Sequence, residues 1–298
     1  MQTFYSRGKL LITSEYLILK GAKGLAIPCN KGQFLEFKVI NSKSLNWKSY
    51  DYNNRIWFEA IFDCENFNCI KSNKKSIAKS LSFILKETRK LNPKFLSING
   101  GEIKTQLEFN LNWGLGSSST LISNLAQLNK INAYKLLSNT YGGSGYDIAC
   151  SLVESPIIYE IKNNNYNEVN FNPPFKEKLF FVYLNKKQNS KIEVDKFNNI
   201  KVDKKIIKSI NSITEIISKT KKYDEFNFLI KKHEQIISNV IKKTSVKKLK
   251  FQDFKGEIKS LGAWGGDFIL ASGLDSPSYF KSKGYKTIIK FDDMVYRR

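Results

Sequence analysis

The chain has 298 residues, of which 41% are hydrophobic and 13% aromatic, enough to bury the core of one large or two ordinary domains. This composition excludes a disordered chain. The single histidine and the four cysteines, which form no C-x-x-C pair, leave almost no ligands for a zinc site.

The formal net charge of +22 suggests nucleic-acid binding as one hypothesis, but the charge is spread evenly. Residues 1–150 carry 20 basic and 10 acidic side chains, and residues 151–298 carry 29 and 17. Most basic residues are lysines, whereas arginine suits bidentate phosphate and base contacts. We therefore favour a lysine-rich solvated surface that attracts anionic substrates over a nucleic-acid interface.

The first residues, MQTFYSRGKLLITSEYLIL, have no continuous apolar core of signal-peptide length. No run reaches the ~18 apolar residues of a membrane span. Isolated cysteines fit a reducing compartment, so the sequence predicts a cytoplasmic protein without a membrane partner.

Hydrophobic periodicity predicts an α+β protein. The predicted elements are, in chain order, one or two strands over 3–28, a strand over 31–40, a helix over 75–91, strand-like alternation over 95–110, a helix after residue 120, strands over 156–161 and 178–185, helices over about 203–221 and 224–243, and strand-like segments after 260–271. The last helix is predicted to turn Phe228, Leu229, Ile236, Ile237 and Val240 inward. This order suggests two domains joined near residues 162–176.

Glycines gather in four short stretches, where they allow backbone N–H groups to approach a ligand closely. They are Gly8; Gly114 and Gly116; Gly142, Gly143 and Gly145; and Gly262, Gly265 and Gly266. Several such loops in one chain suggest a cradle for a polyanion.

The stretch NWGLGSSSTL, residues 112–121, fits this hypothesis best. Gly114 and Gly116 shape a turn, and three serines then open a helix, whose N-terminus suits phosphate. A serine hydroxyl there can also ligate Mg²⁺. A plain serine N-cap is the alternative. The stretch is not a Walker loop, nor a dinucleotide fingerprint, whose third glycine would fall at Ser119.

Four further residues have open roles. Asp147 follows a glycine loop and is a candidate general base, metal ligand or helix N-cap. Lys9, taken alone, is expected to turn its ammonium to solvent. His233 lies in a predicted helix away from the glycine stretches, which indicates a surface or packing role. Trp264 could stack on a ligand or close the core.

Together, the four stretches resemble the GHMP kinase superfamily, named for galactokinase, homoserine, mevalonate and phosphomevalonate kinases. The matching segments are GKLLITSEY (8–16), NLNWGLGSSS (110–119), SGYDIA (144–149) and GAWGGD (262–267), in the order of the family. The tyrosine of SEY, the GYDIA string and the Gly-Asp pair are more similar to the phosphomevalonate branch. A smaller group of GHMP kinases that carries GYDIA is closer still.

The resemblance implies a two-domain α+β fold. Residues 1–165 would resemble ribosomal protein S5 domain 2 and hold the phosphate-binding loop. Residues 166–298 would form a ferredoxin-like domain, with ATP in the cleft between the domains.

It also implies an ATP-dependent kinase that transfers the γ-phosphoryl group to a hydroxyl or phosphate of an anionic metabolite. Phosphomevalonate or mevalonate of isoprenoid biosynthesis would be the acceptor. The alternatives are another acceptor, such as homoserine or a sugar, and a non-catalytic nucleotide-binding protein. We expect a monomer or homodimer that does not bind nucleic acid.

The resemblance assigns roles to individual residues. Asp147 would take the acceptor's proton, Lys9 would lie near it and stabilise negative charge, and Ser118 would ligate Mg²⁺, with Ser117 as the alternative. The phosphates would lie on Gly114, Leu115, Gly116, Ser117, Ser118 and Ser119. The substrate side would be lined by Ser144, Gly145, Gly262, Ala263, Gly265 and Gly266.

The chain departs from the family pattern at three places. Ser14 replaces a glycine of the first motif, and Asn110 replaces the proline before the phosphate loop. Several members place a magnesium-binding glutamate between the second and third motifs, but no acid occurs here from Asn110 to Tyr146. The metal would then depend on Ser118, the phosphates, water and Asp147.

Overall fold

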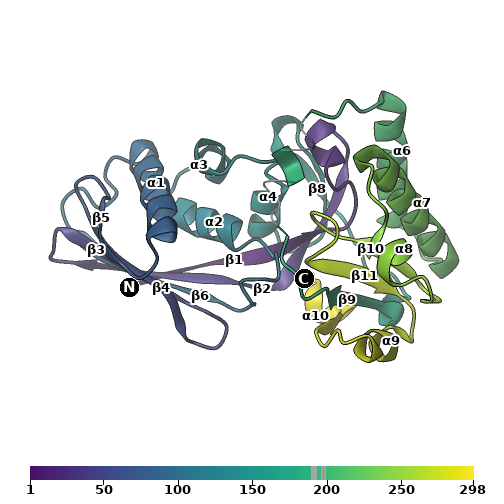
Figure 1. Ribbon diagram of the computed structural model, residues 1–298. Helices are drawn as coiled ribbons and strands as arrows, with labels where there is room; N and C mark the ends of the chain where they lie inside the picture. The colour runs from purple at the N-terminus through teal and green to yellow at the C-terminus, as the bar shows by residue number, and fades with distance from the viewer. Residues whose placement is uncertain (189–192, 196, 198) are drawn as a thin grey trace. The chain divides into compact units, whose positions relative to one another are not determined.

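The computed structural model describes residues 1–188, 193–195, 197 and 199–298, and the chain divides into two compact units (Figure 1). The first unit comprises residues 1–8, 31–111 and 116–152; the second comprises 9–30, 112–115 and 153–298. Each unit mixes helices and strands, as an α+β chain should. The boundary between residues 165 and 166 stays a prediction, because a compact unit can combine distant segments of a chain.

The strands are β1 (Gln2–Leu11), β2 (Gly24–Ile40), β3 (Ser44–Tyr50), β4 (Ile56–Asp63), β5 (Cys69–Ser72), β6 (Gly100–Leu107), β7 (Ile157–Glu160), β8 (Asn165–Glu168), β9 (Leu179–Tyr183), β10 (Glu257–Ser260), β11 (Phe268–Ser272) and β12 (Ile288–Lys290). The α-helices are α1 (Lys75–Leu91), α2 (Ser117–Asn129), α3 (Ala133–Thr140), α4 (Tyr146–Leu152), α6 (Lys204–Ile217), α7 (Tyr223–Ile241), α8 (Val246–Lys250), α9 (Ser276–Ser282) and α10 (Phe291–Met294). Among the described residues, short 3₁₀ turns are η1 (Leu17–Lys20), η2 (Lys162–Asn164) and η3 (Lys176–Lys178).

The first unit is built on strands in the order β5-β4-β3-β6-β2, in which only the β3–β6 pair is parallel. Strand β4 alternates, so that Phe58, Ala60 and Phe62 are buried on one face. Helices α1, α2 and α3 cover one face of these strands (Figure 1). Strands β3, β4 and β5 are absent from the sequence-based expectation.

Helix α1 begins and ends where the periodicity of residues 75–91 predicts. Leu81, Ile84, Leu85 and Thr88 are buried at helical spacing. They pack into a core with α2, α3 and the apolar faces of β3 and β4. This core holds the first turn of α2, which carries the serine row, in a fixed position.

The second unit contains an antiparallel sheet in the order β10-β11-β9-β12. All five residues of β11, Phe268–Ser272, are buried, because both neighbouring strands and packed helices enclose it. The first residues of β2 pair with β7, which in turn pairs with β8.

Helices α6 and α7 lie close to their predicted ranges and pack against each other. The predicted inward face of α7 is wrong at Phe228, which is 64% exposed. Phe226, Ile230 and His233 are buried instead. In the described part of the chain, no helix is long and apolar enough to cross a membrane.

Candidate functional site

Lys9, near the end of β1, is bonded to the phosphate stretch. Its backbone N–H donates to the carbonyl of Leu115 at 3.0 Å. Its ammonium donates to the carbonyl of Gly114 at 3.1 Å. The solvent-facing side chain expected from Lys9 alone is therefore wrong, and the first and second glycine motifs meet in the second unit.

The turn of the phosphate stretch depends on its two glycines. Gly114 and Gly116 have φ values of 68° and 88°, in the left-handed region that favours glycine. The buried side chain of Leu115 anchors the turn between them. Gly116 is the N-cap of α2, and no side chain caps this helix end. The alternative prediction of a plain serine N-cap is therefore wrong. The first-turn N–H groups of α2 have no side-chain cap, and such a helix N-terminus suits an anion.

The three serines of α2 differ in their surroundings. Ser118 is exposed, Ser117 is half-buried and Ser119 is buried. The hydroxyl of Ser119 donates a hydrogen bond to Oδ2 of Asp147, in the first turn of α4. Within the first unit, the second and third motifs therefore meet through Ser119 and Asp147.

The third motif is a tight glycine turn before α4. Gly142, Gly143 and Gly145 all have positive φ values. The N–H of Ala149 donates to the carbonyl of Gly145, so the helix starts at this glycine, and Ser144 is buried beside it. Oδ1 of Asp147 accepts a hydrogen bond from the N–H of Ile148 at 3.2 Å. This bond within α4 helps to orient the Asp147 carboxylate.

The fourth motif is the loop before β11. Gly262 and Gly265 have φ values of 62° and 85°, and Ala263 is buried. Trp264 is 3% exposed and packs in an apolar cluster with Tyr16 of the first motif and with Leu17, which follows it. This tryptophan therefore closes the core of the second unit.

Gly266 has no room for a side chain. A methyl group on its Cα would lie 2.5 Å from Cγ of Gln188 and 2.6 Å from the carbonyl oxygen of Lys186. The segment 186–188 thus packs directly against the fourth motif. Nothing in the sequence pattern identified Gln188.

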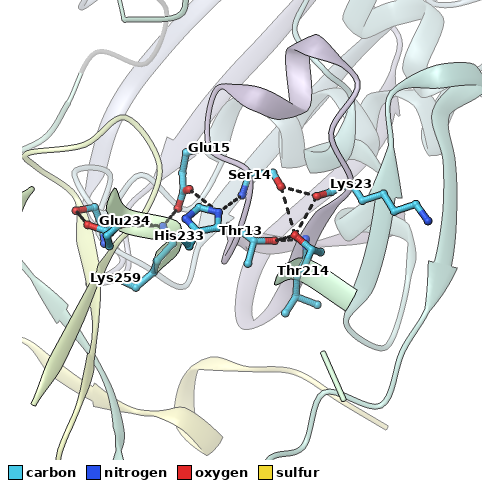
Figure 2. A network of polar contacts seen from close by, with 10 residues as sticks. Thr13, Ser14, Glu15, Lys23, Thr214, His233, Glu234 and Lys259 are labelled. Atoms are coloured by element: carbon cyan, nitrogen blue, oxygen red, sulfur yellow. Dashed lines mark hydrogen bonds and ion pairs between the residues drawn. The ribbon is translucent and has the colours of Figure 1, made fainter. Parts of the chain in front are cut away.

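The serine that replaces the first-motif glycine keeps a glycine-like backbone. Ser14 has a φ of 72°. Its N–H donates to Nε2 of His233 at 2.9 Å, and its hydroxyl donates to the carbonyl of Lys23 (Figure 2). These bonds offset the strain of a positive φ. His233 was expected to lie away from the motifs; the structure corrects this, because α7 carries it directly to Ser14.

Beside Ser14 lies a buried charge network, which consists of Glu15, His233, Glu234 and Lys259 (Figure 2). The Lys259 ammonium forms ion pairs with Glu15 and, at 3.1 Å, with Glu234. Glu234 also accepts the N–H and hydroxyl of Ser260. These contacts join α7 and β10 to the first motif within the second unit.

Burial controls the protonation of this network. Burial raises the pKa of Glu15 to about 7; the Lys259 ammonium opposes this change and the Glu234 carboxylate adds to it. Burial and then the Lys259 ammonium hold the pKa of His233 well below its usual range. His233 is therefore neutral, as its acceptance of the Ser14 N–H requires.

A cavity of about 140 Å³ in the first unit opens beside the serine row. Ser117 and Ser118 line one part of it, and the rings of Trp47, Trp57 and Tyr141 line another. Nε1 of Trp57 is buried without a hydrogen-bond partner. A planar, polar-edged group fits such a lining.

Metal ligands are few. Among the described residues, no group of three or more histidine, cysteine, aspartate or glutamate side chains could hold a metal ion. The oxygen donors near the phosphate stretch are the serine hydroxyls and the Asp147 carboxylate, which are the ligand types that Mg²⁺ prefers. They fit an ion that is also held by phosphates and water.

No family model and no curated protein matches the chain. Solved structures match it over its whole length, and the fold they share with it is the two-domain fold of the GHMP kinases, as the four motifs predicted.

Three of these structures are a mevalonate kinase, a phosphomevalonate kinase and a galactokinase. The Methanococcus jannaschii mevalonate kinase has a TM-score of 0.71 at 14% identity, over 100% of this chain and 98% of that one. The Streptococcus pneumoniae phosphomevalonate kinase, in complex with phosphomevalonate and AMPPNP, has 0.68 at 16%, over 98% and 100%. The Lactococcus lactis galactokinase, complexed with galactose, has 0.72 at 14%, over 99% and 93%.

The expected proximity of Lys9 to Asp147 stays a prediction, because these two residues belong to different units. The metal role of Ser118 and the substrate roles of Ser144, Gly145 and the fourth motif also stay predictions.

Proposed function

We propose that this chain is a cytoplasmic, ATP-dependent small-molecule kinase of the GHMP superfamily. The observation that carries the proposal is the Ser119–Asp147 hydrogen bond, which joins an uncapped helix N-terminus to a carboxylate. An anion-binding helix end beside a potential proton acceptor is what phosphoryl transfer needs. The shared fold of small-molecule kinases supports the same function.

The nucleotide phosphates would lie on residues 114–119. Gly114 and Gly116 shape the turn with positive φ values, and the N–H groups at the start of α2 would donate to phosphate oxygens. The purine would occupy the aromatic cavity beside Ser117 and Ser118, where the indole N–H of Trp57 offers a donor.

Asp147 would act on the acceptor. Its carboxylate accepts the proton of the acceptor's hydroxyl or phosphate, whose oxygen then attacks the γ-phosphorus, and the bond to the β-phosphate oxygen breaks to release ADP. Lys9, held at the Gly114 carbonyl, would stabilise the negative charge that develops.

Mg²⁺ would be held by the hydroxyl of Ser118, with Ser117 as the alternative and Asp147 as the acidic ligand. Once bound, it would neutralise charge on the phosphates and polarise the transferred group. The exposed hydroxyl of Ser118 is available for this role, whereas Ser119 already donates to Asp147.

The acceptor would be phosphomevalonate or mevalonate, with homoserine or a sugar as the alternative within the same class. The net charge of +22 favours an anionic acceptor. The S. pneumoniae structure that shares this fold contains phosphomevalonate. We also propose a monomer or homodimer that has no nucleic-acid partner.

The test measures ADP release from Mg·ATP with mevalonate, 5-phosphomevalonate, homoserine, galactose or no acceptor. Wild-type protein should release ADP with one acceptor, and Asp147→Asn should lower kcat by about 10³-fold, because it removes the proton acceptor. Asp253→Asn is the control, since this exposed aspartate pairs with Lys283 outside the site and should not change kcat. Wild-type activity retained by Asp147→Asn would contradict the mechanism.

The second candidate is a non-catalytic nucleotide-binding protein with the same fold. The lack of an acidic residue from Asn110 to Tyr146 favours it. Calorimetry separates the candidates: ATP binding without turnover on any acceptor supports the second one, and Asp147→Asn would then leave binding unchanged.

A further inference from the structure

Asp267, the last residue of the fourth motif, lies against the phosphate stretch. A methyl group on Gly114 would be 2.7 Å from Cγ of Asp267, and 2.8 and 3.0 Å from its two carboxylate oxygens. A methyl group on Gly262 would be 3.8 Å from Oδ2. The carboxylate therefore fills the space that two glycines, from two motifs of the second unit, leave open.

The backbone of Asp267 is held by residues 184 and 186, which directly follow β9, the strand that pairs with β11. Its N–H donates to the carbonyl of Lys186 at 2.7 Å, and its carbonyl accepts the N–H of Leu184 at 2.8 Å. Its φ of 51° is one that few side chains adopt. Asp267 is thus held in one strained conformation with its carboxylate toward Gly114.

Gln188 fixes the carboxylate itself. Its N–H donates to Oδ1 of Asp267 at 3.2 Å, and its side-chain amide donates to the carbonyl of Trp264 at 2.9 Å. One residue therefore ties both the acid and the glycine loop to the same segment. Asp267 is only 7% exposed, so it has little freedom to turn to solvent.

The Lys9 ammonium lies on the carbonyl side of Gly114, where its Nζ donates to the carbonyl oxygen at 3.1 Å. Burial raises the pKa of the Asp267 carboxyl, and the Gln188 N–H and the Lys9 and Lys187 ammoniums act in the opposite direction. Lys9 and Asp267 therefore both contact Gly114, Lys9 at its carbonyl and Asp267 beside its Cα. Burying a carboxyl group costs desolvation, so the position of this acid against the glycine turn needs an explanation.

We propose that Asp267 is a positioning residue for phosphoryl transfer: its carboxylate packs against Gly114 and keeps the glycine turn closed, so that the Gly114 carbonyl stays within reach of the Lys9 ammonium. The proposal rests on the proposed function, because Lys9 needs a fixed position only if it stabilises charge during phosphoryl transfer. It also gives the acid of the fourth motif a part in the site, in a chain that has no acid between its second and third motifs.

A double-mutant cycle tests whether Asp267 acts through Lys9. Asp267→Asn removes the charge but suits a positive φ, and Asp267→Gly is a second variant that suits it equally. Asp267→Asn should lower kcat about tenfold in wild-type protein and less than about twofold in Lys9→Met protein. The KM for ATP should change little. Losses of kcat that simply add would overturn the proposal.

A second readout needs no catalysis. When the Asp267 carboxylate no longer packs against Gly114, the Lys9 ammonium should lose its hydrogen bond to the Gly114 carbonyl more often, so its acetylation by acetic anhydride should become roughly threefold faster. Mass spectrometry compares Lys9 with exposed Lys79 in the same sample. Asp253→Asn is the matched control: it frees Lys283 and should leave Lys9 labelling unchanged.

The two readouts separate the two proposals. Unchanged Lys9 labelling in both Asp267 variants overturns the positioning role, whatever the activity. Faster Lys9 labelling in the Asp267 variants, combined with wild-type protein that transfers phosphate to no acceptor, upholds the positioning of Lys9 by Asp267 while the proposed kinase function fails.

Discussion

Ser14 shows how a single residue can replace a glycine without a change of backbone. The residue keeps a φ of 72°, a conformation costing of order 1 kcal/mol for a side chain with a Cβ. Its N–H and hydroxyl both find partners, His233 and Lys23, that a glycine could use only in part. The substitution in the first motif is therefore accommodated by α7, and it is not a sign that the motif has decayed.

Glu15 should make the stability of the protein depend on pH. Its folded pKa of about 7 lies above the ordinary value of 4.5, so the folded protein binds a proton that the unfolded chain releases. The sign follows: the stabilisation is complete below pH 4.5 and is lost as pH rises through 7. Between pH 5.5 and 8, wild type should lose about 2 kcal/mol of unfolding free energy relative to Glu15→Gln.

Urea unfolding of both proteins at the two pH values measures this difference. His233 and Glu234 titrate in both proteins, so their direct contributions largely cancel in the comparison. Unfolding free energies that differ by the same amount at pH 5.5 and pH 8 would show that Glu15 is ionised throughout, as a simple ion pair with Lys259 would be.

At the scale of elements, the N-terminus of α2 should be the most sensitive part of the site. Gly116 has a φ of 88° as N-cap, so Gly116→Ala should cost about 1–2 kcal/mol of stability and shift the first-turn N–H groups. We expect ATP affinity to fall more than about tenfold, since several donors move together. Calorimetry measures the affinity, and thermal unfolding measures the stability.

Gly284→Ala is the matched control for this variant. Gly284 has a φ of 87° with open space around it, so the same substitution carries the same backbone cost outside the site. Stability should fall by a similar amount with ATP affinity unchanged. If both variants bind ATP equally well, the start of α2 is not the phosphate site.

Hydrophobic periodicity predicted the ranges of the helices better than it predicted which face of each helix is buried. Helices α1, α6 and α7 lie close to their expected ranges because each buries a stripe of apolar residues at helical spacing. On α7, however, Phe228 is exposed and His233 is buried, since the face that matters is set by a polar contact with Ser14. A hydrophobicity pattern carries no information about such a contact.

The same limit applies to the candidate site. The motifs located Lys9, the glycine turn, the serine row and Asp147, because their chemistry is local in the sequence. The contact of Asp267 with Gly114 and that of Lys259 with Glu15 join residues more than a hundred positions apart. Only the folded chain brings such pairs together, and each residue alone looks like an ordinary surface charge.

At the scale of the whole molecule, the two units should not survive separation at the predicted domain boundary. The second unit includes residues 9–30 and 112–115, which a fragment ending at residue 165 would leave without their partners. The buried side chains of Ile12, Leu17 and Leu25 would then be exposed. We expect fragment 1–165 to aggregate, and to be recovered only when it is co-expressed with fragment 166–298.

Size-exclusion chromatography and amide hydrogen exchange of the two fragments, alone and together, measure this outcome. A monomeric fragment 1–165 with a protected core would show instead that the boundary separates two autonomous domains.

The pairing of early and late segments also bears on how the protein is made. Cys29 forms a β-bridge with Val295, and the N–H of Tyr296 donates to the carbonyl of Pro28 at 2.9 Å. A ribosome delivers Pro28 and Cys29 long before it delivers Val295 and Tyr296. The backbone of Pro28 and Cys29 must therefore remain without these partners until residues 295 and 296 have emerged, and during that interval a chaperone can bind the segment.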